Sequence, residues 1–166
     1  MARGTLFEVK TDPKGIGSMS EEDFYEDLEV LNVNYVADRS YDEQEYDRDW
    51  FIDTFRKYGA TVQSYSPEDD AEEHFPNGTY TVSGIGLEFK EKWFQDKWQS
   101  LKKQVDDISL EEFSCNIWTA YDIRKLVDDS MTHAVYLDGG IYTLDRFIRG
   151  ADEKSTYYLG TTVLMH

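Results

Sequence analysis

The sequence contains few of the residues that build metal centres and covalent cross-links. Its 166 residues include one cysteine, Cys115, and three histidines, His74, His133 and His166. A structural zinc site needs several Cys or His ligands at short helical or hairpin spacings, and these four residues have none. One cysteine cannot form an intramolecular disulfide. The sequence therefore predicts neither a zinc site nor a disulfide scaffold.

Basic residues are also scarce. There are 17 Lys and Arg against 34 Asp and Glu, which gives a formal net charge of −17. Surfaces that bind phosphates need clustered Lys and Arg, so we expect no direct binding to nucleic acid or to an anionic membrane. No apolar run has the length of a transmembrane helix, and no signal-peptide-like segment follows Met1. These features predict a cytoplasmic protein without a membrane span.

Sequence motifs for catalysis or cofactor binding are missing. Gly15-Ile16-Gly17 and Gly84-Ile85-Gly86 lack the third glycine of a dinucleotide fingerprint and the Gly-Lys-Ser/Thr of a phosphate loop. The acidic run Asp42–Asp47 has an aspartate where a calcium loop needs glycine. No Gly-x-Ser-x-Gly elbow is present, and close carboxylate pairs are uninformative among 34 acids. We predict no catalytic residue, no cofactor and no metal ligand, although an enzyme without a readable motif stays an alternative.

Cys115 is a candidate nucleophile, because it is the one cysteine of the sequence. It lies between Phe113 and Ile117 in an apolar stretch. Lone cysteines in such surroundings are usually small core residues, so we interpret Cys115 as buried and structural.

Apolar and aromatic residues are numerous enough for a folded core. Leu, Ile, Val and Phe together provide 38 residues, and Phe, Trp and Tyr provide 25. This apolar fraction exceeds the roughly 20% below which charged chains stay disordered. The length favours one domain, residues 1–166.

Hydrophobic periodicity predicts a mixture of helices and strands. Capping boxes at Ser20/Asp23 and Ser109/Glu112 mark two helix starts. Expected strands are 4–10, 60–65, 79–83, 133–137, 141–142 and 157–165; expected helices are 21–32, 42–58, 94–108, one from 109 onward and one within 143–150. Residues 33–37 fit a strand or a helix equally well. The lack of regular β-α-β alternation predicts an α+β fold. We expect four to five helices on a mixed or mainly antiparallel sheet, with a C-terminal hairpin turning at Asp138-Gly139-Gly140.

The helix over 94–108 is expected at the centre of this fold. Its apolar residues recur at spacings of four and three: Phe94, Trp98, Leu101, Val105 and Ile108. The next helix is expected to turn Phe113, Ile117, Ala120, Ile123 and Val127 inward.

Negative charge is concentrated in one part of the chain. Glu21–Asp53 contains 13 acids but only Arg39 and Arg48 as bases. Two rows of carboxylates have helical spacing: Glu22, Glu26 and Glu29 in the first, and Asp42, Glu45, Asp49 and Asp53 in the second. At ~1.5 Å rise per residue they recur every ~4.5–6 Å, comparable to the phosphate spacing of a nucleic-acid strand.

These rows support one functional hypothesis among several. A carboxylate row could dock on a basic protein surface, as an acidic interaction module or a nucleic-acid-mimicking inhibitor. Alternatively, the acidic faces only keep the protein soluble. Other readings are a small-molecule-binding domain or enzyme, and a self-associating structural or accessory subunit. The sequence fixes neither the partner nor the oligomeric state.

Overall fold

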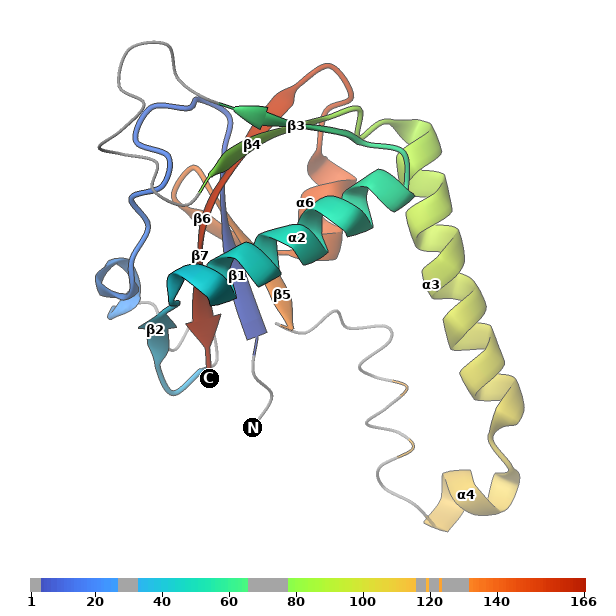
Figure 1. Cartoon of the computed structure of the whole chain (residues 1–166). Helices are drawn as coiled ribbons and strands as arrows, with labels where there is room; N and C mark the ends of the chain where they lie inside the picture. The colour runs from blue at the N-terminus through green and yellow to red at the C-terminus, as the bar shows by residue number, and fades with distance from the viewer. Residues whose placement is uncertain (1–3, 27–32, 66–77, 116–118, 120–122, 124–131) are drawn as a thin grey trace.

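A computed structural model describes residues 4–26, 33–65, 78–115, 119, 123 and 132–166. Within these residues seven strands form one sheet, with the order β3-β4-β7-β1-β5-β6 and with β2 also paired to β7 (Figure 1). Only β1 and β5 run parallel. The strands are β1 (Gly4–Lys10), β2 (Val36–Asp38), β3 (Thr61–Tyr65), β4 (Thr79–Ser83), β5 (His133–Leu137), β6 (Gly140–Thr143) and β7 (Thr156–Met165).

The described helices are η1, a 3-10 turn (Glu21–Phe24), α2 (Tyr41–Lys57), α3 (Leu87–Asp107), α4 (Leu110–Cys115) and α6 (Leu144–Gly150). Local caps explain two of the helix starts. The Ser40 side chain accepts a hydrogen bond from the Glu43 amide and opens α2. The Thr143 hydroxyl accepts one from the Arg146 amide and opens α6. Each cap satisfies a backbone donor that the first turn leaves unpaired.

The two faces of the sheet carry separate apolar clusters. Because side chains alternate along a strand, Phe7 and Val9 of β1 point to one face and Leu6 to the other. The first face is covered by α2, α6 and the start of α3, through Phe51, Phe55, Phe89, Trp93 and Phe147. The second, smaller cluster contains Met19, Phe24, Val36, Ala134, Val163 and Met165. The larger aromatic core therefore lies under α2.

A buried carboxylate stabilises the central strands. Glu8 is 1% exposed and accepts hydrogen bonds from the amides of Gly17 and Thr161 and from the Thr161 hydroxyl, at 2.8, 3.0 and 2.9 Å. The β1–β7 register shifts at this point. A Cβ at Gly160 would lie 2.3 Å from Glu8 Oε2, so glycine makes room for the carboxylate. Charged hydrogen bonds of this kind compensate for the loss of water.

The α+β class and the mainly antiparallel sheet are confirmed. Predicted strands 4–10 and 79–83 match β1 and β4, and helix 42–58 matches α2 within one residue. The hairpin forms as expected, with Asp138 at φ 48° and Gly139 at φ 90°. Two positive φ values suit the right-handed twist of the strands. After the hairpin, α6 and β7 complete the fold.

The prediction of a helix over 21–32 is wrong where the structure tests it. Only Glu21–Phe24 is helical, as a 3-10 turn, and residues 27–32 lie outside the described residues. The expected capping contact does form, since the Asp23 carboxylate accepts the Ser20 amide at 2.8 Å. The Glu21 amide then donates to Asp38 and the Asp38 amide donates to Glu21, which ties this turn to β2. Residues 33–37, left open by the sequence, lead into β2.

The prediction that Phe94, Trp98, Leu101, Val105 and Ile108 form the centre of the core is also wrong. Trp98 is 58% exposed and Val105 is 49% exposed. The buried residues of α3 are Phe89 and Trp93, near its start. Figure 1 shows α3 running from the end of α2 away from the sheet, with α4 at its far end. At 3.6 residues per turn, Trp98 lies about 140° around the helix from Trp93, so Trp98 and Val105 point away from the core, whereas Phe94 packs partly against it.

Two predictions about the next segment fail for the same reason. Cys115 is exposed instead of buried, and Phe113 of α4 is 61% exposed. Both lie at the far end of α3, away from either apolar cluster. Ile123 is helical and partly buried, whereas Ile117, Ala120 and Val127 lie outside the described residues, as does the acidic stretch 66–73.

Candidate functional site

The outer face of α2 carries the second predicted carboxylate row. Asp42, Glu45, Asp49 and Asp53 are all exposed, and Phe51 and Phe55 are buried on the opposite side of the helix. We call these four residues the α2 acidic face. None of the four side chains forms a hydrogen bond or an ion pair in the part of the chain that the structure describes. Tyr46, which is 75% exposed, lies on the same side of the helix.

The cations near α2 are engaged elsewhere. Arg39 contacts Glu43 and Asp47, at 3.3 and 3.1 Å. Arg56 donates to the backbone oxygen of Val62, and Lys57 lies 3.8 Å from Asp96. These contacts leave the α2 acidic face without a neutralising partner.

Arg48 is the cation closest in sequence to this face, but it points inward. It is 2% exposed, and burial lowers the pKa of its guanidinium, against the opposing effect of Glu45 and Asp49. Its Nη1 atom has no hydrogen-bond partner. Arg48 therefore belongs to the buried side of α2 and forms no ion pair with the acidic face.

Asp47 is a carboxylate of α2 that does not belong to the acidic face. It is buried and accepts hydrogen bonds from the hydroxyls of Thr5 and Thr162, at 3.4 and 3.2 Å. Burial raises the pKa of Asp47, although Arg39 and the two hydroxyls oppose this. Asp47 thus joins α2 to β1 and β7 and has a structural role.

The first predicted row does not continue this surface. Glu22 of η1 and Glu26 just after it are exposed, but Glu29 lies outside the described residues. Phe24 of η1 packs in the second cluster, whereas α2 packs over the first, so Glu22 and Glu26 lie on the other side of the sheet from the α2 acidic face. The structure therefore does not bring these two residues together with that face.

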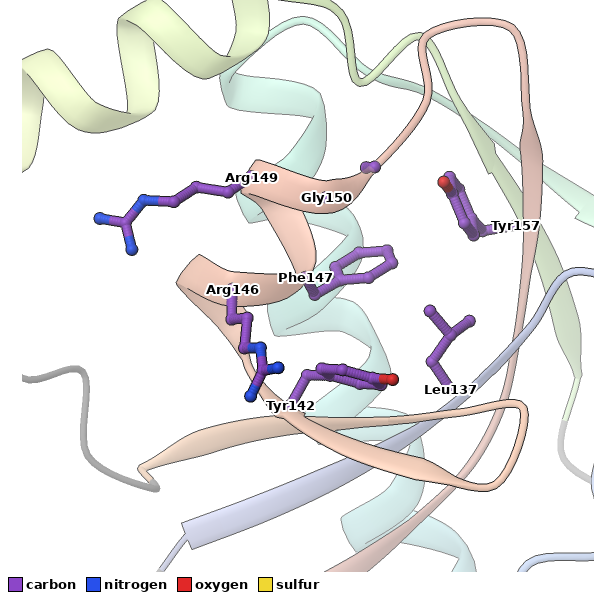
Figure 2. A pocket seen from close by; sticks show the side chains of 8 residues that line it. Leu137, Tyr142, Arg146, Phe147, Arg149, Gly150 and Tyr157 are labelled. Carbon is purple, nitrogen blue, oxygen red and sulfur yellow. The ribbon is translucent and has the colours of Figure 1, made fainter.

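A pocket of about 480 Å³ lies at the other end of the chain (Figure 2). Its lining residues come from the hairpin, α6 and β7: Leu137, Tyr142, Arg146, Phe147, Arg149, Gly150, Ala151 and Tyr157. Phe147 and Tyr157 are buried and their rings meet edge to face, 5.2 Å apart. The Arg146 guanidinium lies over the Tyr142 ring at 5.2 Å. In Figure 2 Arg149 points away from these rings, and its guanidinium lies 4.6 Å from the Phe94 ring.

Sequence reasoning found the elements around this pocket but missed the pocket. The hairpin, α6 and β7 were all predicted, yet no motif marks their convergence. The available signal was two arginines near Tyr142, Phe147 and Tyr157 in a strongly acidic chain. These residues indicate a pocket only once the structure shows that the hairpin, α6 and β7 lie next to one another.

The C-terminal part of α3 presents an exposed apolar surface. The α3 apolar stripe, already predicted from the sequence, comprises Phe94, Trp98, Leu101, Val105 and Ile108; Trp98 and Val105 are exposed, and Phe94 packs partly against the larger cluster. The helix itself contains five acids and five lysines, so this element carries no net charge. An exposed apolar surface of this kind is characteristic of an interaction site.

In the described ranges, no group of three His, Cys, Asp or Glu side chains could hold a metal ion. None of the described helices is long and apolar enough to cross a membrane. Comparison with protein-family models, with curated proteins and with solved structures gives no match.

Proposed function

We propose that this protein is an acidic interaction module that docks on a basic protein surface through the α2 acidic face. The observation that carries the proposal is the set of four exposed carboxylates on one side of a regular helix, with no cation paired to them. Their spacing along the axis, ~4.5–6 Å, suits a groove built for the phosphates of a nucleic acid. The partner is then a nucleic-acid-binding protein, and this chain competes with its nucleic acid.

The physical setting favours fast, salt-sensitive binding. Surface carboxylates without a paired cation produce a negative electrostatic potential that extends over roughly a Debye length. This potential attracts a positively charged groove. Tyr46 adds a large amphipathic side chain beside the carboxylates. Tyrosine is enriched at the centre of protein interfaces, where it contributes contact area at low entropic cost.

The test neutralises the α2 acidic face. The variant D42N/E45Q/D49N/D53N is expected to fold normally and to gain a few tenths of a kcal/mol, because like charges at i and i+4 repel each other. Immobilised wild-type protein is expected to retain basic nucleic-acid-binding proteins from a cell lysate at low salt and to release them in a salt gradient. Added duplex DNA should compete for the captured protein. The variant should retain none of them.

A matched control removes the same number of charges elsewhere. Glu91, Asp106, Asp107 and Glu111 are exposed residues of α3 and α4. Changing them to Gln or Asn should leave capture intact if the α2 acidic face is the docking surface. Equal capture by wild type and both variants, or equal losses in both, would contradict the proposal.

The α3 apolar stripe favours a second candidate function, self-association. The net charge of −17 makes copies of the chain repel each other, but this charge lies outside α3. Two copies can therefore approach most easily through this helix, which has no net charge. Pairing of the stripe from two copies would bury Trp98 and Val105. Sedimentation equilibrium should then show a dimer that the change Trp98→Glu converts to a monomer. A monomeric wild-type protein at high protein concentration would rule this candidate out.

A further inference from the structure

Hydrogen bonds from residues that do not line it position the walls of the pocket between the hairpin, α6 and β7. Lys90 of α3 donates hydrogen bonds to the backbone oxygens of Arg149 and Ala151, at 3.1 and 2.6 Å, and so fixes the end of α6. The Tyr157 hydroxyl accepts the Asp152 amide at 2.9 Å. Two of the pocket walls are therefore positioned without a ligand.

A glycine positions the third wall. A Cβ at Gly140 would lie 2.8 Å from ring atoms of Tyr142, so the absence of a side chain lets the tyrosine ring lie against β6. Ligand pockets are commonly preformed in this way, with volumes of roughly 300–1,000 Å³. At about 480 Å³ this pocket has the size of a site for a small organic molecule.

The walls select an aromatic or flat apolar group. Phe147, Tyr157, Leu137 and Tyr142 surround the space in Figure 2. Aromatic rings favour edge-to-face and offset contacts with another ring, worth more than the buried area alone.

The charge at the pocket is positive, in contrast to the rest of the chain. Arg146 and Arg149 form no ion pair within the described residues. Three acids of the neighbouring chain segments already accept hydrogen bonds from other residues. The Asp138 carboxylate accepts from Thr11, and the Asp152 carboxylate accepts from Ser155. The Asp145 carboxylate accepts from Trp93 and Lys97. The guanidinium of Arg146 lies on the face of Tyr142, which leaves its N–H edges for an anion.

We propose that this pocket binds a small aromatic carboxylate, with the ring against Phe147 and Tyr157 and the carboxylate on Arg146. Of the two lining arginines, only Arg146 lies beside a pocket ring, and one guanidinium, whose fork matches the two carboxylate oxygens, favours a carboxylate over a phosphate, which needs more donors. Because Arg149 points away from the rings, Arg146 is the arginine that pairs with the ligand. This site is separate from the α2 acidic face.

The experiment titrates the full chain with 2-naphthoate and follows backbone amides by NMR. Shifts are expected in residues 137–157. The change Arg146→Gln should weaken binding by about tenfold or more, as expected for the loss of a charged hydrogen bond. The uncharged analogue 2-naphthamide should bind wild type about as weakly as 2-naphthoate binds the variant.

Two variants make the result specific. Lys102→Gln removes one positive charge from exposed α3 and should leave binding unchanged. A Cβ at Gly150 meets no atom within 4 Å, so Gly150→Leu is expected to fold and to obstruct the pocket, abolishing the binding of both probes. The proposal is overturned by absence of binding at millimolar 2-naphthoate, by equal affinity for the two probes, by equal effects of Arg146→Gln and Lys102→Gln, or by shifts centred on Trp98.

Discussion

Helices α2 and α3 both carry apolar residues at spacings of three and four, yet they are buried to very different extents. In α2 the repeat lies over the aromatic core, and Phe51 and Phe55 are 1% and 0% exposed. In α3 the repeat of Trp98, Leu101 and Val105 points away from the protein, and burial is limited to Phe89 and Trp93. The comparison teaches that a periodic pattern defines a face, while burial depends on what the fold places opposite it.

The opposing surfaces come from distant parts of the chain. Phe51 meets Phe7 of β1 at 5.0 Å, and Phe55 lies within ring contact of Phe89, Trp93 and Phe147. The start of α3 has a comparable partner, since Trp93 Nε1 donates to the buried Asp145 of α6 at 2.7 Å. Beyond Lys97, which also contacts Asp145, α3 has left the core.

The largest expected difference is between Phe55→Ala and Trp98→Ala. Removing the Phe55 ring leaves a cavity in the core and should cost about 3–5 kcal/mol. Removing the exposed Trp98 ring should change the free energy of unfolding by less than about 0.5 kcal/mol. Urea unfolding of both variants measures this. A large loss for Trp98→Ala in a monomeric sample would contradict the comparison.

Within α3 itself, a smaller effect should separate the buried part from the exposed part. Trp93→Phe keeps most of the ring but removes the hydrogen bond to Asp145, so it should cost about 1–3 kcal/mol. Trp98→Phe is the matched change on the exposed face and should be close to neutral. If thermal unfolding showed the two variants to be equally stable, Asp145 would not hold α3 in place.

A pH-dependent effect on stability is expected at the edge of the α2 interface. His133 stacks on Trp50 of α2, with ring centroids 3.7 Å apart, and burial lowers its pKa to about 4. Its ordinary value is near 6.5, so the unfolded chain binds a proton first as the pH falls. Burial of the neutral His133 ring therefore contributes fully to the stability of the fold above pH 6.5, and this contribution is lost as the pH falls from there towards 4.

The change His133→Phe isolates this contribution from that of the many carboxylates. Phenylalanine keeps an aromatic ring beside Trp50 but does not titrate. As the pH falls from 6.5 to 4, the unfolding free energy of the wild type should therefore decrease relative to that of the variant. A constant difference across this range would show that His133 is protonated equally in the folded and unfolded states.

The sequence was a good guide wherever the deciding interaction is local. The capping contacts at Ser20 and Ser109, the Asp138-Gly139 turn and the strand over 4–10 involve neighbours a few residues apart, and all were found in the structure. The exposure of Asp42, Glu45, Asp49 and Asp53 was also predictable, because a regular helix with buried Phe51 and Phe55 turns these residues outward.

Tertiary structure alone decided what each face meets. It separated Glu22 and Glu26 from the α2 acidic face, because η1 and α2 pack on opposite faces of the sheet. It exposed Trp98 and Cys115, because α3 extends beyond the elements that could cover it. It also brought Tyr142, Arg146 and Tyr157 to one pocket, because β1 pairs with both β5 and β7 and so joins the hairpin to the C-terminal strand. Such contacts depend on chain segments far apart in sequence, and a single sequence carries no direct signal of them.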